Sequence, residues 1–170
     1  MKIFVVDDDP NVVDLLPIIL ANEGFDDVHC FLSPAQGLAA LKKPHSAFEC
    51  LILDIDMPGM DGITLCEHVR ALRDYRDVPI IMLTALRDEK TVRAAIRAGA
   101  NDYITKPFDV LEIGVRVRMA AKIVDVQAPP NHRHGSERRH ASAQKATRAL
   151  VTREEIMNMF SDELYRSKVR

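Results

Sequence analysis

The sequence lacks the long apolar segments that would place a protein in or across a membrane. None of its apolar runs approaches the roughly 18 consecutive residues that a membrane span needs. The opening residues Met1 to Val6 meet three aspartates at the point where a signal peptide would continue its apolar stretch. We therefore expect a cytoplasmic protein with no membrane partner.

Cysteine is also scarce, with only Cys30, Cys50 and Cys66 in 170 residues. Their number is odd, their spacing fits no metal site, and each lies inside or beside an apolar run. We expect them to be small buried hydrophobic side chains, because free cysteine behaves in this way in protein cores. Neither disulfides nor thiol chemistry is predicted.

The charge shows no excess of one sign, since 23 basic residues face 25 acidic ones. This balance lacks the strong basic bias that is typical of nucleic-acid-binding proteins, so we expect no direct contact with nucleic acid. The average hides an asymmetry. Residues 1–127 carry 14 basic and 20 acidic side chains, whereas residues 128–170 carry 9 and 5. The first part is therefore acidic (14 − 20 = −6) and the second basic (9 − 5 = +4).

Short apolar runs alternate with longer helical patterns through the first part of the chain. The runs are rich in Val, Ile and Leu, and they cover residues 3–6, 28–32, 50–54, 80–84 and 102–104. Helical spacing or capping signals cover about residues 10–24, 33–43, 62–73, 88–98 and 110–124. This alternation predicts an α/β fold, a doubly wound five-stranded parallel sheet covered by five helices.

The rest of the chain predicts a linker followed by one more helix. We divide the sequence into a domain over residues 1–126, a solvated linker over 127–150 and an amphipathic helix over 151–170. Thr152 and Glu155 have the spacing of a capping box at the start of that helix. An apolar stripe follows, formed by Ile156, Met159, Phe160 and Leu164.

Polar side chains follow the ends of four of the predicted strands. Because the carboxyl ends of parallel strands meet at the same edge of a sheet, these side chains are expected to share one site. They are Asp7 and Asp8 after the first strand, Asp54 and Asp56 at the third, Thr84 at the fourth, and Lys106 after the fifth.

This set of side chains favours phosphoryl chemistry with a magnesium ion. Carboxylates repel one another by about 4 kcal/mol per pair at 4 Å and an effective dielectric constant near 20, and a hard cation such as Mg²⁺ relieves that repulsion. Lys106 offers a positive charge and Thr84 a hydroxyl donor to phosphoryl oxygens. Asp54 is the best placed candidate for a carboxylate nucleophile.

Four sequence motifs carry a resemblance to a known family. They are Val-Val-Asp-Asp at 5–8, Asp-Ile-Asp-Met-Pro-Gly-Met-Asp-Gly at 54–62, Ile-Ile-Met-Leu-Thr-Ala at 80–85, and Asp-Tyr-Ile-Thr-Lys-Pro-Phe at 102–108. Together, in this order, they resemble the receiver domains of bacterial two-component response regulators. The resemblance covers about residues 1–124.

The resemblance implies a flavodoxin-like sheet with strand order 2-1-3-4-5 and a site for phosphoryl transfer. Asp54 would accept a phosphoryl group from a phosphohistidine of a sensor histidine kinase or phosphotransfer protein. The side chains of Asp7, Asp8 and Asp54 and the backbone carbonyl of Asp56 would bind Mg²⁺. Lys106 would bond the phosphoryl group.

The resemblance also implies a conformational switch. Thr84 and Tyr103 would form the switch pair, and the surface of the fourth helix, fifth strand and fifth helix would change on phosphorylation. That surface would bind a downstream protein. A homodimer would form either through the same surface or through the C-terminal helix. The Lys106–Pro107 peptide bond would be cis. The chain would be a phosphoacceptor that assists its own phosphorylation and dephosphorylation, not an ordinary enzyme.

Three alternatives stay open from the sequence. The chain could be the receiver portion of a longer effector enzyme, such as a cyclic-dinucleotide synthase or hydrolase, or of a transcription factor cut short near Arg170. A reading frame that continues past Arg170 would favour either one. A magnesium-dependent phosphatase would share the spacing of Asp54 and Asp56, but the paired Asp7 and Asp8 and the Thr-Lys-Pro run argue against it.

Overall fold

The computed structural model describes residues 1–85 and 89–127, and these contain one parallel β-sheet. The strand order is β2-β1-β3-β4-β5, which confirms the predicted flavodoxin-like topology. All four strand pairings are parallel. The strands are β1 (Ile3–Val6), β2 (Val28–Phe31), β3 (Cys50–Asp54), β4 (Ile80–Thr84) and β5 (Asp102–Thr105).

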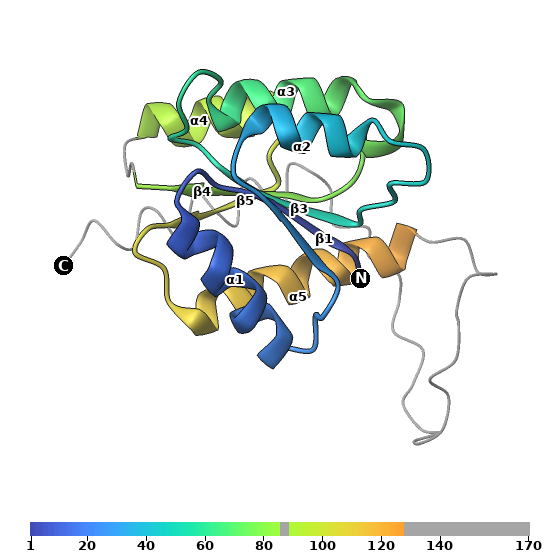
Figure 1. Ribbon diagram of the computed structural model, residues 1–170, viewed down its shortest axis with the longest axis vertical. Helices are drawn as coiled ribbons and strands as arrows, with labels where there is room; N and C mark the ends of the chain where they lie inside the picture. Colours follow the sequence, from blue (N-terminus) through green and yellow to red (C-terminus); the bar gives the residue numbers. More distant parts are fainter. Residues whose placement is uncertain (86–88, 128–170) are drawn as a thin grey trace. The chain divides into compact units, whose positions relative to one another are not determined.

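Helices cover both faces of the sheet. In the described residues they are α1 (Pro10–Asn22), α2 (Pro34–Leu41), α3 (Gly62–Ala71), the 3-10 turn η1 (Arg73–Tyr75), α4 (Glu89–Ala98) and α5 (Val110–Gln127). Helices α1 and α5 lie on one face, and α2, α3 and α4 lie on the other (Figure 1). This arrangement buries the central strands from both sides. No helix in the described part of the chain is both long and apolar enough to span a membrane.

Local sequence signals explain where three of the helices begin. The side chain of Asp9 accepts a hydrogen bond from the backbone N–H of Asn11 and caps α1, with Pro10 at the first helical position. Ser33 caps α2 and Asp61 caps α3 in the same manner. These side chains satisfy backbone donors that have no partner within the helix.

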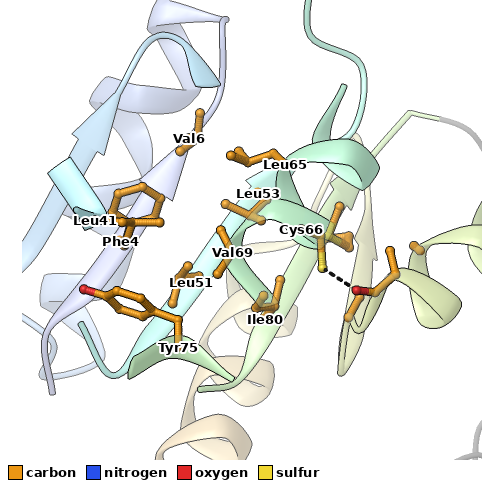
Figure 2. Packing of buried hydrophobic residues seen from close by; sticks show 14 of the residues in the cluster. Phe4, Val6, Leu41, Leu51, Leu53, Leu65, Cys66, Val69, Tyr75 and Ile80 are labelled. Carbon is orange, nitrogen blue, oxygen red and sulfur yellow. Dashed lines mark hydrogen bonds between the residues drawn. The ribbon is translucent and has the colours of Figure 1, made fainter. Parts of the chain in front are cut away.

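The three central strands are completely buried, which is why their sequences are almost continuously apolar. Alternate side chains of these strands enter two separate cores, one on each face of the sheet. Figure 2 shows the core beneath α2 and α3, where residues of β1, β3 and β4 pack against Leu65, Cys66 and Val69 of α3. The predicted strands therefore supply both cores.

The three cysteines are free thiols, as the sequence predicted. Cys50 and Cys66 are buried, and burial raises the pKa of the Cys50 thiol to about 12 and that of Cys66 to about 11. Cys30 is only partly buried; burial, followed by the charge of Asp14, raises its pKa to about 11. All three thiols therefore stay protonated at neutral pH and act as small core or half-buried side chains.

Four helices end two or three residues from the sequence expectation, and two of these, α1 at Asn22 and α2 at Leu41, end two residues early. Helix α3 ends at Ala71 and is followed by η1, where the sequence predicted a continuous helix to about residue 73. Helix α5 continues to Gln127, three residues beyond its predicted end. The remainder of the predicted linker over 127–150 and the predicted helix over 151–170 lie outside the described residues.

The guanidinium group of Arg70 explains why the chain turns after α3. It donates hydrogen bonds to the backbone carbonyls of Gly99, Tyr75 and Val78 at 2.7–2.9 Å, and to Asn101 Oδ1 at 2.8 Å. Two of these acceptors, Tyr75 and Val78, lie before β4, and the other two, Gly99 and Asn101, lie between α4 and β5. One half-buried side chain therefore links the end of α3 to the segments that precede β4 and β5.

Gly62 is predicted to be intolerant of any side chain, because α3 begins directly against the strand that carries Asp54. An added Cβ would lie 1.9 Å from the backbone oxygen of Asp54. Replacing Gly62 with alanine should destabilise the protein by about 2–3 kcal/mol through overpacking. Denaturant unfolding of the full chain would measure this cost.

Gly59→Ala is the matched control in the same loop. Gly59 has φ of +83° but open space around its Cβ position, so alanine there should cost about 1 kcal/mol from backbone strain alone. A Gly62→Ala variant as stable as Gly59→Ala would contradict the proposed close contact.

Candidate functional site

The polar residues that follow the strands converge at the carboxyl edge of the sheet, as predicted. Asp7 follows β1, Asp54 ends β3, Thr84 ends β4, and Lys106 follows β5. The side chains of Asp7, Asp54 and Thr84 are almost fully buried, with relative exposures of 0%, 1% and 0%. Because β1 and β3 are neighbours in the sheet, Asp7 and Asp54 are held side by side.

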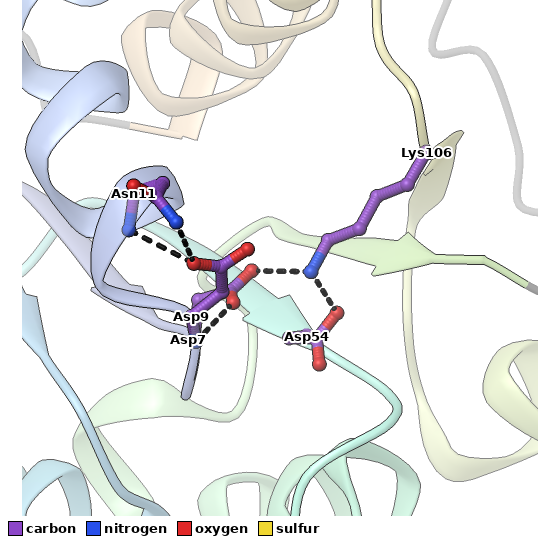
Figure 3. Close-up of polar contacts among 5 residues, drawn as sticks. All are labelled: Asp7, Asp9, Asn11, Asp54 and Lys106. Carbon is purple, nitrogen blue, oxygen red and sulfur yellow. Dashed lines mark hydrogen bonds and ion pairs between the residues drawn. The ribbon is translucent and has the colours of Figure 1, made fainter.

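Lys106 bridges the two buried carboxylates (Figure 3). Its Nζ atom lies 2.7 Å from Asp7 Oδ2, to which it donates a hydrogen bond, and 2.7 Å from Asp54 Oδ1. The second contact is an ion pair whose angles are not those of a hydrogen bond. Asp54 Oδ1 is therefore a buried carboxylate oxygen with no hydrogen-bond donor among the described residues. The charge of this oxygen is thus balanced by an ammonium group at 2.7 Å.

The electrostatics of the site follow from burial and from these contacts. Burial raises the pKa of Asp54 to about 6, while the Lys106 ammonium opposes this shift and the charges of Asp7 and Asp56 add to it. Burial by itself would lower the pKa of Lys106, but the two carboxylates outweigh that effect and raise it. Lys106 therefore keeps its positive charge, and Asp54 is ionised at neutral pH.

The acidic residues fit a magnesium ion. Asp7, Asp8 and Asp54 each offer a carboxylate oxygen, and these oxygens lie within 4.8 Å of one another. Asp8 is exposed whereas the other two are buried, so one side of the cluster is open to water. Mg²⁺ binds a few carboxylate oxygens and keeps several waters, so a cluster of three carboxylates with one open side suits it. Asp56 follows β3 with its side chain exposed, in the loop where the family resemblance implies a carbonyl ligand.

The two residues of the expected switch pair lie on adjacent strands. The hydroxyl-bearing side chain of Thr84 is buried, and its backbone oxygen accepts a 2.7 Å hydrogen bond from Lys106 N. Tyr103 is partly buried and packs against the core beneath α3 and α4. The peptide bond between Lys106 and Pro107 is cis.

The sequence predicted the strand-end positions of Asp7, Asp54, Thr84 and Lys106, but not the contacts of Lys106 with the two carboxylates. The prediction treated Lys106 only as a partner for phosphoryl oxygens and did not include its hydrogen bond to Asp7. No local pattern could have signalled that contact, because 99 residues separate the two side chains along the chain. Only the strand order places them together.

Comparison with known proteins agrees with the fold. The model of the response regulator receiver domain family matches residues 3–118, which is more than half of the chain. The chain belongs to this family. This receiver has 41% identity over 117 residues to the DNA-binding response regulator MtrA of Mycolicibacterium smegmatis, covering 69% of this chain and 49% of MtrA.

Another curated relative and several solved structures are also similar to the receiver region of this chain. The alkaline phosphatase synthesis transcriptional regulatory protein PhoP of Bacillus subtilis is 34% identical over 137 residues, which cover 80% of this receiver chain and 55% of PhoP. The chain therefore spans about half the length of these curated relatives. A CheY-like response regulator receiver domain protein from Methanospirillum hungatei aligns with a TM-score of 0.68 at 27% identity, covering 75% of this chain and 98% of that one.

A putative response regulator from Chloroflexus aurantiacus gives a TM-score of 0.65 at 36% identity. The match covers 73% of this receiver chain and 97% of the solved chain. The matches cover nearly the whole of each solved chain and share its fold, whereas the curated relatives are about twice as long as the matched region.

Mg²⁺ is expected to stabilise the folded receiver through the acidic cluster. Because only the folded chain brings the three carboxylates together, Mg²⁺ at 100 times its dissociation constant should add about 2.7 kcal/mol of stability. Asp8→Asn should lose most of this gain, since it removes an exposed carboxylate without disturbing the core. Thermal unfolding with and without MgCl₂ would measure the difference.

Asp9→Asn is the control for the loss of one negative charge in the same loop. Asparagine caps a helix as well as aspartate does, so α1 should be preserved and the Mg²⁺ response retained. An equal Mg²⁺ response in Asp8→Asn and the unaltered protein would argue against a magnesium site in this cluster.

Proposed function

We propose that this receiver is a cytoplasmic phosphorylation switch in which Asp54 accepts a phosphoryl group. The donor would be the phosphohistidine of a sensor histidine kinase or a phosphotransfer protein. The observation that carries the proposal is the position of the Asp54 carboxylate. It lies buried at the end of β3, in contact with an ammonium group and within 4.8 Å of two further carboxylates.

The chemistry requires an ionised carboxylate as the nucleophile and positive charges near the phosphoryl oxygens. A carboxylate oxygen of Asp54 attacks the phosphorus atom, and the phosphorus–nitrogen bond breaks with its electron pair returning to the imidazole. Asp54 is ionised at neutral pH because its pKa of about 6 lies below 7. A magnesium ion held by Asp7, Asp8, Asp54 and the carbonyl of Asp56 would neutralise negative charge on the phosphoryl oxygens. Lys106 adds a second positive charge beside the same oxygens.

The sheet register supports the proposed switch. Met82 of β4 pairs with Tyr103 of β5, and Thr84 lies two residues beyond Met82. Side chains two residues apart in a strand share a face, so Thr84 and Tyr103 belong to the same face of the sheet. Movement of the Thr84 hydroxyl towards a phosphoryl group would therefore change the packing space next to Tyr103. The responding surface would be α4, β5 and α5, for a downstream protein or a second copy of the chain.

The output of the whole protein is proposed from its relatives. MtrA is named as DNA-binding and PhoP as a transcriptional regulatory protein, and the chain spans about half of each. These relatives favour the interpretation that the receiver controls transcription through a further DNA-binding part. A reading frame that continues past Arg170 into such a part would support it, and a stop codon there would favour output by protein binding alone.

Incubation of the full chain with MgCl₂ and acetyl phosphate should add one phosphoryl group, measured by intact-protein mass spectrometry. Asp54→Asn should abolish the addition, because the amide is not a nucleophile towards phosphorus. Asp26→Asn removes an exposed carboxylate from the loop before β2 and should leave the addition unchanged.

Two outcomes would overturn the proposal. A phosphoryl group that remains in Asp54→Asn would place the acceptor elsewhere. Rapid turnover of many phosphomonoesters by the unaltered chain would favour the phosphatase alternative, in which Asp56 acts as a second catalytic carboxylate.

A further inference from the structure

The C-terminal end of α4 is held by two side chains of α3. Arg70 donates hydrogen bonds from Nε and Nη2 to the carbonyl oxygen of Gly99, at 2.9 and 2.7 Å. The Cys66 thiol donates a weaker bond to the carbonyl of Ala98 at 3.5 Å, drawn as the dashed line in Figure 2. Carbonyls at the end of a helix lack partners within it, and a positive charge beside them is favourable. Arg70 and Cys66 therefore cap α4 from the side.

The other donors of the Arg70 guanidinium bind the neighbouring segments. Nη1 donates to the carbonyls of Tyr75 and Val78, both at 2.7 Å, and Nη2 donates a second bond to Asn101 Oδ1 at 2.8 Å. A guanidinium group has five N–H donors in a rigid plane, and these contacts with the two to Gly99 use all of them. One planar group therefore joins the end of α4 to the segments before β4 and β5.

The turn after α4 is shaped for this contact. Gly99 has φ of +109°, a conformation that glycine adopts without steric cost, and an added Cβ would lie 2.8 Å from Arg70 Cγ. Asn101 ties the same turn to β4. Its N–H donates to the carbonyl of Ile80 at 2.8 Å, and its Oδ1 accepts from the N–H of Ile80 at 2.9 Å. The end of α4 is thus fixed both to α3 and to β4.

The two ends of α4 lie at opposite edges of the sheet. The helix follows β4, whose carboxyl end carries Thr84, and it precedes β5, so it runs back from the carboxyl edge to the amino edge. Its 10 residues span about 15 Å. A displacement that starts at Thr84 therefore reaches the N-terminal end of α4 first, far from the bonds of Arg70.

We propose that Arg70 is the fixed point of α4, so that the helix moves as a lever: its N-terminal end shifts while its C-terminal end stays attached to α3. The attachment lets α4 tilt over the sheet but prevents it from sliding along the sheet. Arg70 lies at the edge opposite Asp54, so it is a positioning residue of the switch. The movement in response to a phosphoryl group rests on the proposed function, whereas the attachment does not.

Hydrogen exchange of backbone amides in the full chain, followed by NMR without a phosphodonor, tests the attachment. In Arg70→Met, exchange at Gly99, Ala100 and Asn101 should become at least about tenfold faster, because the bonds that stabilise this turn are lost. Arg70→Lys should behave in the same way, since an ammonium group cannot reproduce the planar fork. Arg73→Met removes an exposed arginine from η1 and should change these rates by less than about twofold.

A second measurement uses the unaltered protein and does not depend on the folding of a variant. Excess acetyl phosphate with MgCl₂ should change exchange at Arg93 and Ala94, in the first turns of α4, by at least about threefold. The rates at Gly99 and Asn101 should change by less than about twofold under the same conditions. In Arg70→Met, the same addition should also change the rates at Gly99 and Asn101, because the fixed point is gone.

Two results would overturn the inference. Exchange at Gly99 and Asn101 that is as slow in Arg70→Met as in the unaltered protein would exclude the attachment. Rates that change as much at Gly99 as at Arg93 when the unaltered protein is phosphorylated would exclude the lever.

The outcome can be separated from that of the proposed function. If the unaltered chain accepts a phosphoryl group and exchange changes along the whole of α4, the lever fails and the proposed function stands. If Arg70→Met loosens the turn after α4 but the unaltered chain accepts no phosphoryl group, the attachment stands. The proposed function then fails, together with the movement that rests on it.

Discussion

The structure depends on a pair of carboxylates, Asp7 and Asp54, that lie side by side and are almost fully buried. The strand order makes β1 and β3 neighbours, so Asp7 and Asp54 cannot be separated without changing the fold. Helices on both faces of the sheet remove the water that would otherwise weaken their repulsion. A positive charge must therefore be supplied from elsewhere, and the loop after β5 supplies Lys106.

The surrounding residues hold Asp7 and Asp54 in place through close contacts. Gly62 allows the first turn of α3 to lie against the backbone of Asp54, and the Asp9 cap fixes the loop that carries Asp7 and Asp8. Burial has a direct chemical effect, since it brings the pKa of Asp54 close to the physiological range. The same packing that stabilises the fold thus sets the charge state of the proposed phosphoacceptor.

The sequence predicted the elements and the site residues because both leave local signals. Buried parallel strands are continuous apolar runs, and polar residues at their ends mark the site edge. Features that depend on distant partners left no such signal. The end of α3 is set by hydrogen bonds from Arg70 to carbonyls up to 29 residues away, and the contact of Lys106 with Asp7 spans 99 residues. The C-terminal helix over 151–170 stays a prediction.

The pairing of Met82 with Tyr103 has a consequence for how the family could tolerate insertions and deletions. Side chains alternate between the faces of a strand, so a one-residue slip between β4 and β5 would turn Tyr103 to the face opposite Thr84. The sheet could still form, and Asp54 would still lie beside Asp7. The proposed switch would then lose its link between Thr84 and the outer strand, so that a receiver phosphorylated at the proposed acceptor Asp54 would transmit nothing.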